Sequence, residues 1–183
     1  MLSELVNQIR TERNLKPEEV PGFDPQNGNE KAKFLFLLEA PGPKAIKTGR
    51  ISFDNPDPAA KNFKRQLDDA GINREEIVIW NIVPWYIGNA DRTAIRAANS
   101  DDVEAGKVYL KPLVALLPHL KCIVLVGSVA RKAAHMLLSH ITMARIVCCH
   151  HPSARVVNLY PEKHQENIEL FRFLKTTTSA EGS

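Results

Sequence analysis

The chain has 183 residues, of which 44% are hydrophobic and 25% are charged, and its formal net charge is +3 at pH 7. This composition excludes a fibrous or wholly disordered protein, and the length is typical of one compact domain. The small positive charge permits an anionic partner such as nucleic acid, but it does not by itself indicate one.

The N-terminal residues predict a short amphipathic helix over 2–15, because apolar residues recur there at helical spacing. This polar start lacks the apolar core of a signal peptide, and no later run reaches the roughly 20 apolar residues of a membrane helix. We therefore expect a soluble, intracellular and cytoplasmic protein.

Four short apolar runs predict the strands of a buried sheet, and they cover residues 33–39, 76–85, 120–127 and 144–151. The segment 40–56 reads as a long loop. Helical signals cover 57–71, where Asp57 is an N-cap and Gly71 a stop, and then 101–117, 128–140 and 162–174. Strands that alternate with helices need crossover connections, so the fold class is α/β, with a mainly parallel central sheet and helices on both faces. We expect one domain over 1–175 and a flexible tail over 176–183.

Ligands of open α/β sheets bind beyond the carboxyl ends of the strands, so the candidate site lies where the four runs end. After the first run, Glu39 could orient or deprotonate water, or it could cap a loop. Pro41 and Gly42 follow it and form a stiff turn that a flat ligand can approach closely.

The loop that follows carries an aromatic residue, Phe53, which could stack on a base or anchor the loop in the core. Asp54 and Asn55 beside it could form a turn. At the end of the second run, the Asn81 amide offers both a donor and an acceptor, as reading a pyrimidine edge requires, although it could also bond local backbone. At the third end, Ser128 predicts an N-cap and a helix terminus able to receive a phosphate.

The fourth run ends in "VCCHHPSARVV", a dense group of reactive side chains. Adjacent strand residues point to opposite faces, so two cysteines and two histidines in a row cannot converge on one metal ion. Cys148 and Cys149 are therefore interpreted as sheet residues and His150 as a structural neighbour, while His151 leads into a loop. Three cysteines also form no disulfide framework, which favours a reducing compartment.

Together, "EAPGP", "NIVPW" and "HPS", each at a strand end, resemble the motifs of the uracil-DNA glycosylase superfamily. The first is most similar to the E-A-P-G version of the thermophile-type, iron–sulfur-containing branch. The resemblance implies a three-layer α/β/α sandwich with four parallel strands. It also implies a monofunctional hydrolase for base excision repair, which flips a deaminated base out of DNA, cuts its N-glycosidic bond and leaves an abasic site.

The resemblance implies roles for the residues that match its motifs. Glu39 positions the water, with Asp54 as the alternative, and Pro41 and Gly42 shape the pocket. Phe53 stacks on the base, although "SFDN" departs from the usual P-F spacing. Asn81 recognises the uracil edge and His151 donates to the departing base. The backbone of DNA would be contacted by Ser153, Arg155, Ser128 and Lys44, with Lys47 and Arg50 as further basic candidates.

The chain departs from the iron–sulfur branch because it has three cysteines where that branch uses four as cluster ligands. We therefore predict no cluster, no metal and no other cofactor, and a monomer whose partner is DNA with a deaminated base. Arg155 also stands where the family places an apolar wedge. Two alternatives stay open: a non-catalytic module that binds nucleic acid or nucleotide, and a small-molecule or nucleoside hydrolase on the same sheet.

Overall fold

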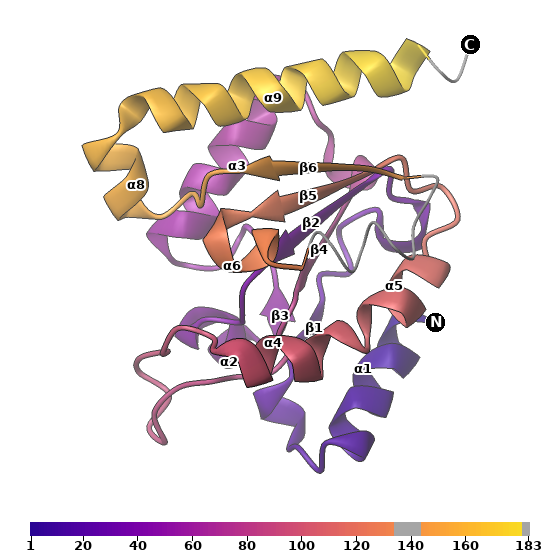
Figure 1. Cartoon of the computed structure of the whole chain (residues 1–183), viewed down its shortest axis with the longest axis vertical. Helices are drawn as coiled ribbons and strands as arrows, with labels where there is room; N and C mark the ends of the chain where they lie inside the picture. Colours follow the sequence, from indigo (N-terminus) through magenta and orange to yellow (C-terminus); the bar gives the residue numbers. More distant parts are fainter. Residues whose placement is uncertain (134–143, 181–183) are drawn as a thin grey trace.

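The computed structural model describes residues 1–133 and 144–180, and its centre is a sheet of four parallel strands. The strands lie in the order β4-β2-β5-β6, so β4 and β6 form the edges (Figure 1). Their bounds are Phe34–Leu38 for β2, Ile77–Asn81 for β4, Cys122–Val126 for β5 and Arg145–Cys149 for β6. All four predicted strands and the parallel α/β fold are thus confirmed.

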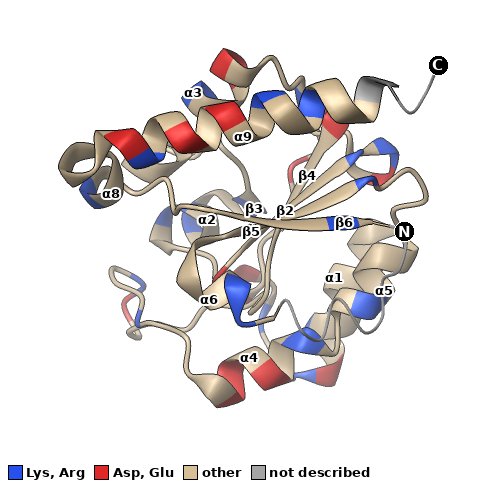
Figure 2. Cartoon of the chain, turned by 45° about the horizontal axis from the view of Figure 1, so that its top comes forward, with Lys and Arg blue, Asp and Glu red and all other residues tan. Residues whose placement is uncertain are grey.

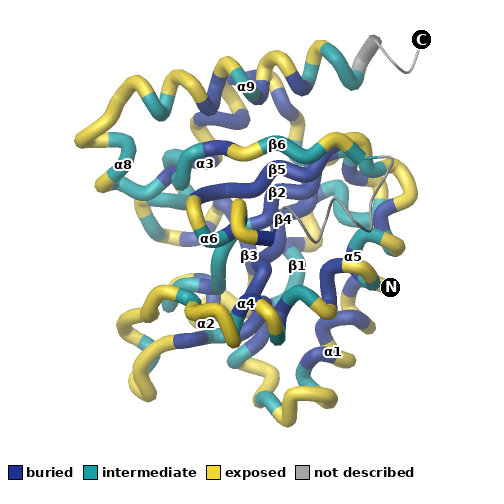
Figure 3. Tube along the Cα trace, in the orientation of Figure 1, coloured by how far each residue is buried: buried dark blue, intermediate teal, exposed yellow. Residues whose placement is uncertain are grey.

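Helices cover both faces of this sheet, which explains why its strands are continuously apolar rather than alternating. Figure 2 shows α3 and α9 on one face, and α1, α4, α5 and α6 on the other. On the first face, Phe36 of β2 makes edge contacts with Phe63 of α3 and Phe171 of α9. Figure 3 accordingly shows β2, β4 and β5 as buried, while the edge strand β6 is partly exposed.

The helices of the described chain are α1 Leu2–Glu12, α2 Pro43–Thr48, α3 Pro58–Ala70, α4 Ser100–Lys107, α5 Leu110–Ala115, α6 Gly127–Arg131, α8 Ala154–Leu159 and α9 Pro161–Ala180. Short 3-10 turns cover Pro17–Glu19, Asn29–Lys31 and Arg74–Glu76, and β1 Gly22–Phe23 pairs in parallel with β3 Arg50–Ile51. None of the described helices is long and apolar enough to cross a membrane.

The predicted boundaries of α3 are confirmed at both ends. The Asp57 carboxylate accepts a hydrogen bond from the main-chain N–H of Ala60 (2.9 Å), and Pro58 occupies the first helical position. Gly71 ends the helix in the left-handed conformation, with φ +72°. The capping residues therefore fix where this helix begins and ends.

Other predicted elements were wrong in extent. The predicted loop 40–56 contains α2 and β3, and the predicted helix 101–117 is divided into α4 and α5. Pro112 explains this break, because it lacks the N–H that a continuous helix would bond to Val108 and its ring would clash with that carbonyl. Ser128 is not an N-cap, since α6 already begins at Gly127. The helix ends at Arg131 and residues 132–133 form a turn, while residues 134–140 of the predicted helix lie outside the described residues.

The C-terminal region also differs from the prediction. A helix that the sequence analysis missed, α8, follows His151, and Pro161 then starts α9 as its first residue. This last helix continues to Ala180, so residues 176–180 are helical where a flexible tail was expected. Consequently α8 and α9 place two helices next to the end of β6.

Candidate functional site

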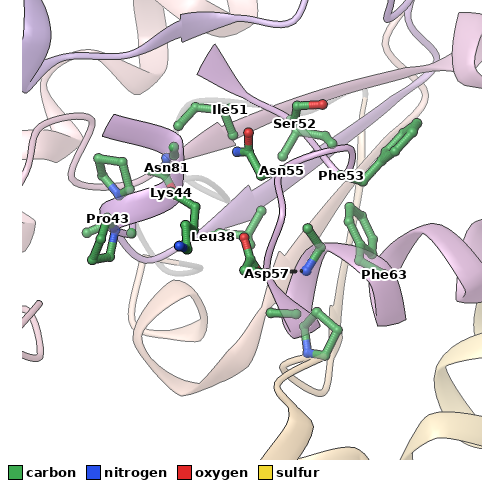
Figure 4. Close-up of a pocket in the computed structure, with 18 of the residues that line it drawn as sticks. Leu38, Pro43, Lys44, Ile51, Ser52, Phe53, Asn55, Asp57, Phe63 and Asn81 are labelled. Carbon is green, nitrogen blue, oxygen red and sulfur yellow. Dashed lines mark hydrogen bonds between the residues drawn. The ribbon is translucent and has the colours of Figure 1, made fainter. Parts of the chain in front are cut away.

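The carboxyl ends of the strands surround one cavity of about 320 Å³. It lies between the segment that follows β2, the loop from β3 to α3, the end of β4 and the segment that follows β6 (Figure 4). The predicted site residues that line it are Pro41, Gly42, Lys44, Phe53, Asn81 and His151. Three of the four strand ends therefore contribute predicted residues to one site.

The base-reading candidate, Asn81, is the last residue of β4 and pairs in register with Leu38 of β2. Its side chain is buried, and its amide nitrogen Nδ2 has no hydrogen-bond partner within the described residues. An unpaired buried donor costs about 1–3 kcal/mol, so fold stability does not account for it. The amide is available to an acceptor on a ligand, and the alternative that Nδ2 bonds local backbone is not realised.

The imidazole of His151 also lines the cavity. Its Nδ1 accepts a hydrogen bond from the main-chain N–H of Ser153 (3.1 Å), so the neutral ring carries its proton on Nε2. Burial lowers the pKa of His151, although the negative charges of Glu39 and Asp57 act in the opposite direction. The ring is consequently a neutral Nε2–H donor at pH 7.

Gly127 supports the ring of His151 from the end of β5. It has φ +84°, and a Cβ placed on it would lie 3.3 Å from the Cβ and 3.4 Å from the Cδ2 of His151. The left-handed backbone conformation therefore favours glycine here, and a Cβ would press against the side chain of His151.

We expect Gly127→Ala to lower the free energy of unfolding by about 1–2 kcal/mol and to displace the His151 ring, because strain and contact act together. Chemical denaturation and the NMR titration of His151 measure the two effects. Gly71→Ala is the matched control, since Gly71 has a similar φ of +72° but no atom within 4 Å of the position that a Cβ would take. It should lose stability while leaving the titration of His151 unchanged; equal titration shifts in both variants would contradict the assignment.

Glu39 lies at the end of β2 but does not line the cavity. Its carboxylate accepts a hydrogen bond from the main-chain N–H of Ala98 (2.7 Å), which matches the alternative that it caps a loop. Its charge nevertheless reaches His151 and raises the pKa of that imidazole against the effect of burial. Glu39 therefore influences the cavity through its negative charge, although its side chain does not line it.

A carboxylate that the sequence analysis did not assign to the site, Asp57, does line the cavity (Figure 4). One of its oxygens caps α3 through Ala60, and its charge also reaches His151. Asp54, the sequence-based alternative for activating water, instead pairs with Arg74 (2.7 Å) and is exposed. The capping signal of Asp57 was visible in the sequence, but it gave no sign that the same side chain faces a cavity.

The predicted stacking residue, Phe53, is buried at the rim of the cavity. The guanidinium of Arg74 lies 4.5 Å from its ring centroid and the ammonium of Lys64 lies 5.5 Å away. In Figure 4 its ring lies at the margin of the group, away from Asn81, while Phe63 lines the cavity as a second aromatic residue. Phe53 thus anchors its loop, one of the two roles considered for it, and also lines the cavity, while stacking on a base stays a prediction.

Asn55 holds the same loop through its side chain. Its Oδ1 accepts from the hydroxyl of Thr48 (2.7 Å), and its Nδ2 donates to the carbonyl of Arg50 (3.1 Å). Both polar atoms of the amide are therefore used within the loop. Asn55 shapes the wall of the cavity, in agreement with its interpretation as a turn residue.

Most candidates for backbone contacts lie on, or cap, helices that follow strand ends, while Arg50 begins β3. Ser153 caps α8, where its hydroxyl accepts from the main-chain N–H of Val156 (3.3 Å), and Arg155 is exposed in the first turn of this helix. Lys44 and Lys47 of α2, Arg50 and Ser128 are also exposed. Figure 2 marks Lys and Arg positions in blue on α2, α6 and α8, the helices that begin after β2, β5 and β6. These positions are suited to an anionic strand running past the cavity.

The two adjacent cysteines lie on opposite sides of β6, as the strand alternation predicts. Cys148 is exposed, while Cys149 is buried and its burial raises the pKa of the thiol. Throughout residues 1–133 and 144–180, no group of three or more His, Cys, Asp or Glu side chains is arranged to hold a metal ion. The side chains that face the cavity supply hydrogen bonding and charge.

The architecture and the site define an α/β/α protein with a cavity at the carboxyl edge of a parallel sheet, lined by a free amide, a neutral imidazole and a carboxylate. The chain belongs to the uracil DNA glycosylase superfamily, whose family model matches residues 25–175. This match spans the three motifs on which the sequence-based resemblance depends, and that resemblance is thereby confirmed.

Two solved structures are similar in fold. A solution NMR structure of a candidate uracil DNA glycosylase from Methanosarcina acetivorans has a TM-score of 0.55 and 16% identity, over 85% of this chain and 98% of that one. The crystal structure of wild-type SMUG2 from Pedobacter heparinus has a TM-score of 0.54 and 15% identity, over 84% of this chain and 77% of that one. Comparison with curated protein sequences gives no match.

Proposed function

We propose that the protein is a monofunctional DNA glycosylase that hydrolyses the N-glycosidic bond of uracil or a related deaminated base in DNA, leaving an abasic site. The observation that carries this proposal is the unpaired amide of Asn81 in the same cavity as the neutral imidazole of His151. Membership of the uracil DNA glycosylase superfamily supports DNA as the partner. A base excision repair function follows from this activity.

The residues suit the charges that develop as the bond breaks. Negative charge grows on the departing base, where the Asn81 amide would donate to a carbonyl and the Nε2–H of His151 to the second base oxygen. Positive charge grows on the sugar, where the carboxylate of Asp57 would stabilise it and orient the water. Glu39 would add negative charge from outside the cavity, while its carboxylate holds the loop through the hydrogen bond from Ala98.

The DNA would be held by groups around the mouth of the cavity. Ser153 and Arg155 on α8, Ser128 on α6 and Lys44 on α2 are proposed to contact phosphates. Pro41 and Gly42 would form one wall against the base, and Phe53 would contact it from the rim. Extruding a base costs a few kcal/mol, which these phosphate contacts would offset.

An oligonucleotide that carries one uracil, followed by alkaline cleavage of abasic sites, tests this function. The wild-type protein should produce cleaved strands, and Asn81→Ala should lower kcat/KM about 10- to 100-fold through loss of the base contact. Asp57→Asn should also lower kcat, although asparagine preserves the N-cap of α3 and therefore its stability. Circular dichroism and thermal unfolding check that both variants stay folded.

Hypoxanthine and xanthine oligonucleotides, single- and double-stranded, extend the test to related bases. Salt-dependent DNA binding without cleavage on any of them would contradict the glycosylase and favour the binding module. Base release from free nucleosides with inert DNA would favour the nucleoside hydrolase instead.

A further inference from the structure

Two asparagines outside the cavity hold the main chain on both sides of His151. Beyond the end of β6, Asn167 of α9 accepts from the N–H of His150 through Oδ1 (2.9 Å) and donates to the carbonyl of His150 through Nδ2 (2.9 Å). On the other side, Asn62 of α3 donates from Nδ2 to the carbonyl of Pro152 (3.0 Å). His151 therefore lies between two residues whose main-chain groups are held by hydrogen bonds to asparagine side chains.

The two hydrogen bonds between Asn167 and His150 take the place of those that a neighbouring strand would make. A strand at the edge of a sheet lacks hydrogen-bond partners on one side, and β6 is such a strand. Where the chain leaves the sheet, the amide of Asn167 pairs with both main-chain groups of His150, as a neighbouring strand would. These bonds fix the main chain at His150, directly after the hydrogen-bonded pairing of β5 with β6 ends at Cys149.

Asn167 belongs to a buried network of polar side chains between α3 and α9. Asn167 is 2% exposed, and its Nδ2 also donates to Oε1 of Gln66 (3.3 Å), which is 1% exposed. The Nε2 of Gln66 contacts Nδ1 of His164 (3.0 Å). Figure 1 shows α3 and α9 packed side by side above the sheet, with α8 joining the end of β6 to α9. A satisfied network of this kind fixes one geometry, because each member restricts its partners.

Neither asparagine lines the cavity, so neither would touch a base. The ring of His151 is set by its main chain, by the N–H of Ser153 on Nδ1 and by the backbone of Gly127 behind it. We propose that Asn167 and Asn62 are positioning residues that fix the main chain of residues 150–152 and thereby aim the imidazole of His151 into the cavity. The catalytic consequence rests on the proposed glycosylase function, whereas the effect on the imidazole does not.

NMR of the histidine ring nitrogens in Asn167→Ala and Asn62→Ala tests the proposal. In the wild-type protein we expect an unprotonated Nδ1 and a pKa below the ordinary value of 6.5. In each variant the pKa of His151 should move upward toward that value, because a looser segment admits water to the ring. Amide exchange of Ser153 should quicken about tenfold, as its bond to Nδ1 is made less often.

Leu174→Ala on α9 is the matched control, because Leu174 is fully buried, lies about 10 Å beyond Asn167 along the helix axis, and has an apolar side chain that cannot hydrogen-bond to residues 150–152. It should destabilise the protein without changing the pKa of His151 or the exchange of Ser153. Asn62→Ala keeps the test decisive if Asn167→Ala does not fold, since Asn62 is only partly buried. Unchanged ring nitrogens and unchanged exchange in the folded variants would overturn the proposal.

Turnover of the uracil oligonucleotide adds a second readout. Both asparagine variants should lower kcat about tenfold with little change in KM, because the base contacts at Asn81 are retained. A wild-type protein that fails to release any base would refute the proposed function. Altered ring nitrogens in the variants would still support the positioning role.

Discussion

Replacing His151 by glutamine should lower kcat on a uracil-containing oligonucleotide by about 10²- to 10³-fold, the range found when one donor to a developing negative charge is removed. The reason is the geometry of the ring: Nδ1 accepts from Ser153, which leaves Nε2–H as the donor. Single-turnover kinetics measure this effect separately from product release. His150→Gln is the control, since the His150 ring pairs with Glu166 (2.7 Å) and its main chain keeps the bonds to Asn167.

The pH dependence of the proposed activity provides a further check on His151. Burial lowers its pKa in the folded state below the ordinary 6.5, so the neutral ring persists at pH values where an exposed histidine is already charged. Activity should therefore be constant near neutral pH and fall only as the pH drops below the lowered pKa. A rate that rises on acidification through this range would show that the imidazolium is the active form.

The lowered pKa of His151 also makes the free energy of unfolding depend on pH. Between the lowered pKa and 6.5 the unfolded chain binds a proton at His151 that the folded chain does not. The contribution of His151 to stability is thus fully present above pH 6.5 and is lost as the pH falls through this window. In His151→Gln this part of the pH dependence of unfolding should disappear.

Arg74→Ala should lower the free energy of unfolding by about 3–5 kcal/mol, because it leaves a buried carboxylate without its cation. The guanidinium donates to Asp24 (2.6 Å), to Asp54 (2.7 Å) and to Oδ1 of Asn27 (3.1 Å), and it lies over the ring of Phe53. The Asp24 side chain is only 1% exposed. Burial raises the pKa of Asp24, but hydrogen bonds and the positive charge of Arg74 outweigh this effect and keep it lowered.

Urea denaturation measures this loss, and two further variants identify its cause. Adding Asp24→Asn to Arg74→Ala should recover a large part of the stability, since the buried charge is then absent. Arg65→Ala breaks an exposed pair with Asp69 (3.6 Å) and should change stability by less than about 1 kcal/mol. Equal losses from Arg65→Ala and Arg74→Ala would contradict the buried-charge explanation.

The sequence was sufficient to predict features whose causes are local. The apolar runs of the strands and the caps of α3 depend on a few neighbouring residues, so their patterns indicate the structure directly. Asn81 and His151 could be located because each follows a predicted strand, and strand ends of a parallel sheet meet at one edge. The break at Val108 could also have been predicted, because Pro112 stands in the middle of the expected helix.

Features that depend on distant parts of the chain could not be predicted. Asp57 has the sequence pattern of an N-cap, and only the fold shows that the same carboxylate faces a cavity. Asn167 looks like any polar residue of a helix, but its partners His150 and Gln66 lie 17 and 101 residues away along the chain. The hydrogen bond from Ala98 to Glu39 spans 59 residues, and no periodicity reports it.

The order of the strands has a consequence for how the site can change. Asn81 ends one edge strand, β4, and His151 follows the other edge strand, β6. Adjacent strands are about 4.8 Å apart, so roughly 14 Å of sheet separates the two strands that supply them. On the proposed function, base selection and bond cleavage would therefore be supported by separate edges of the sheet. Selection for a different lesion would then reshape the β4 edge while the β6 edge keeps its chemistry.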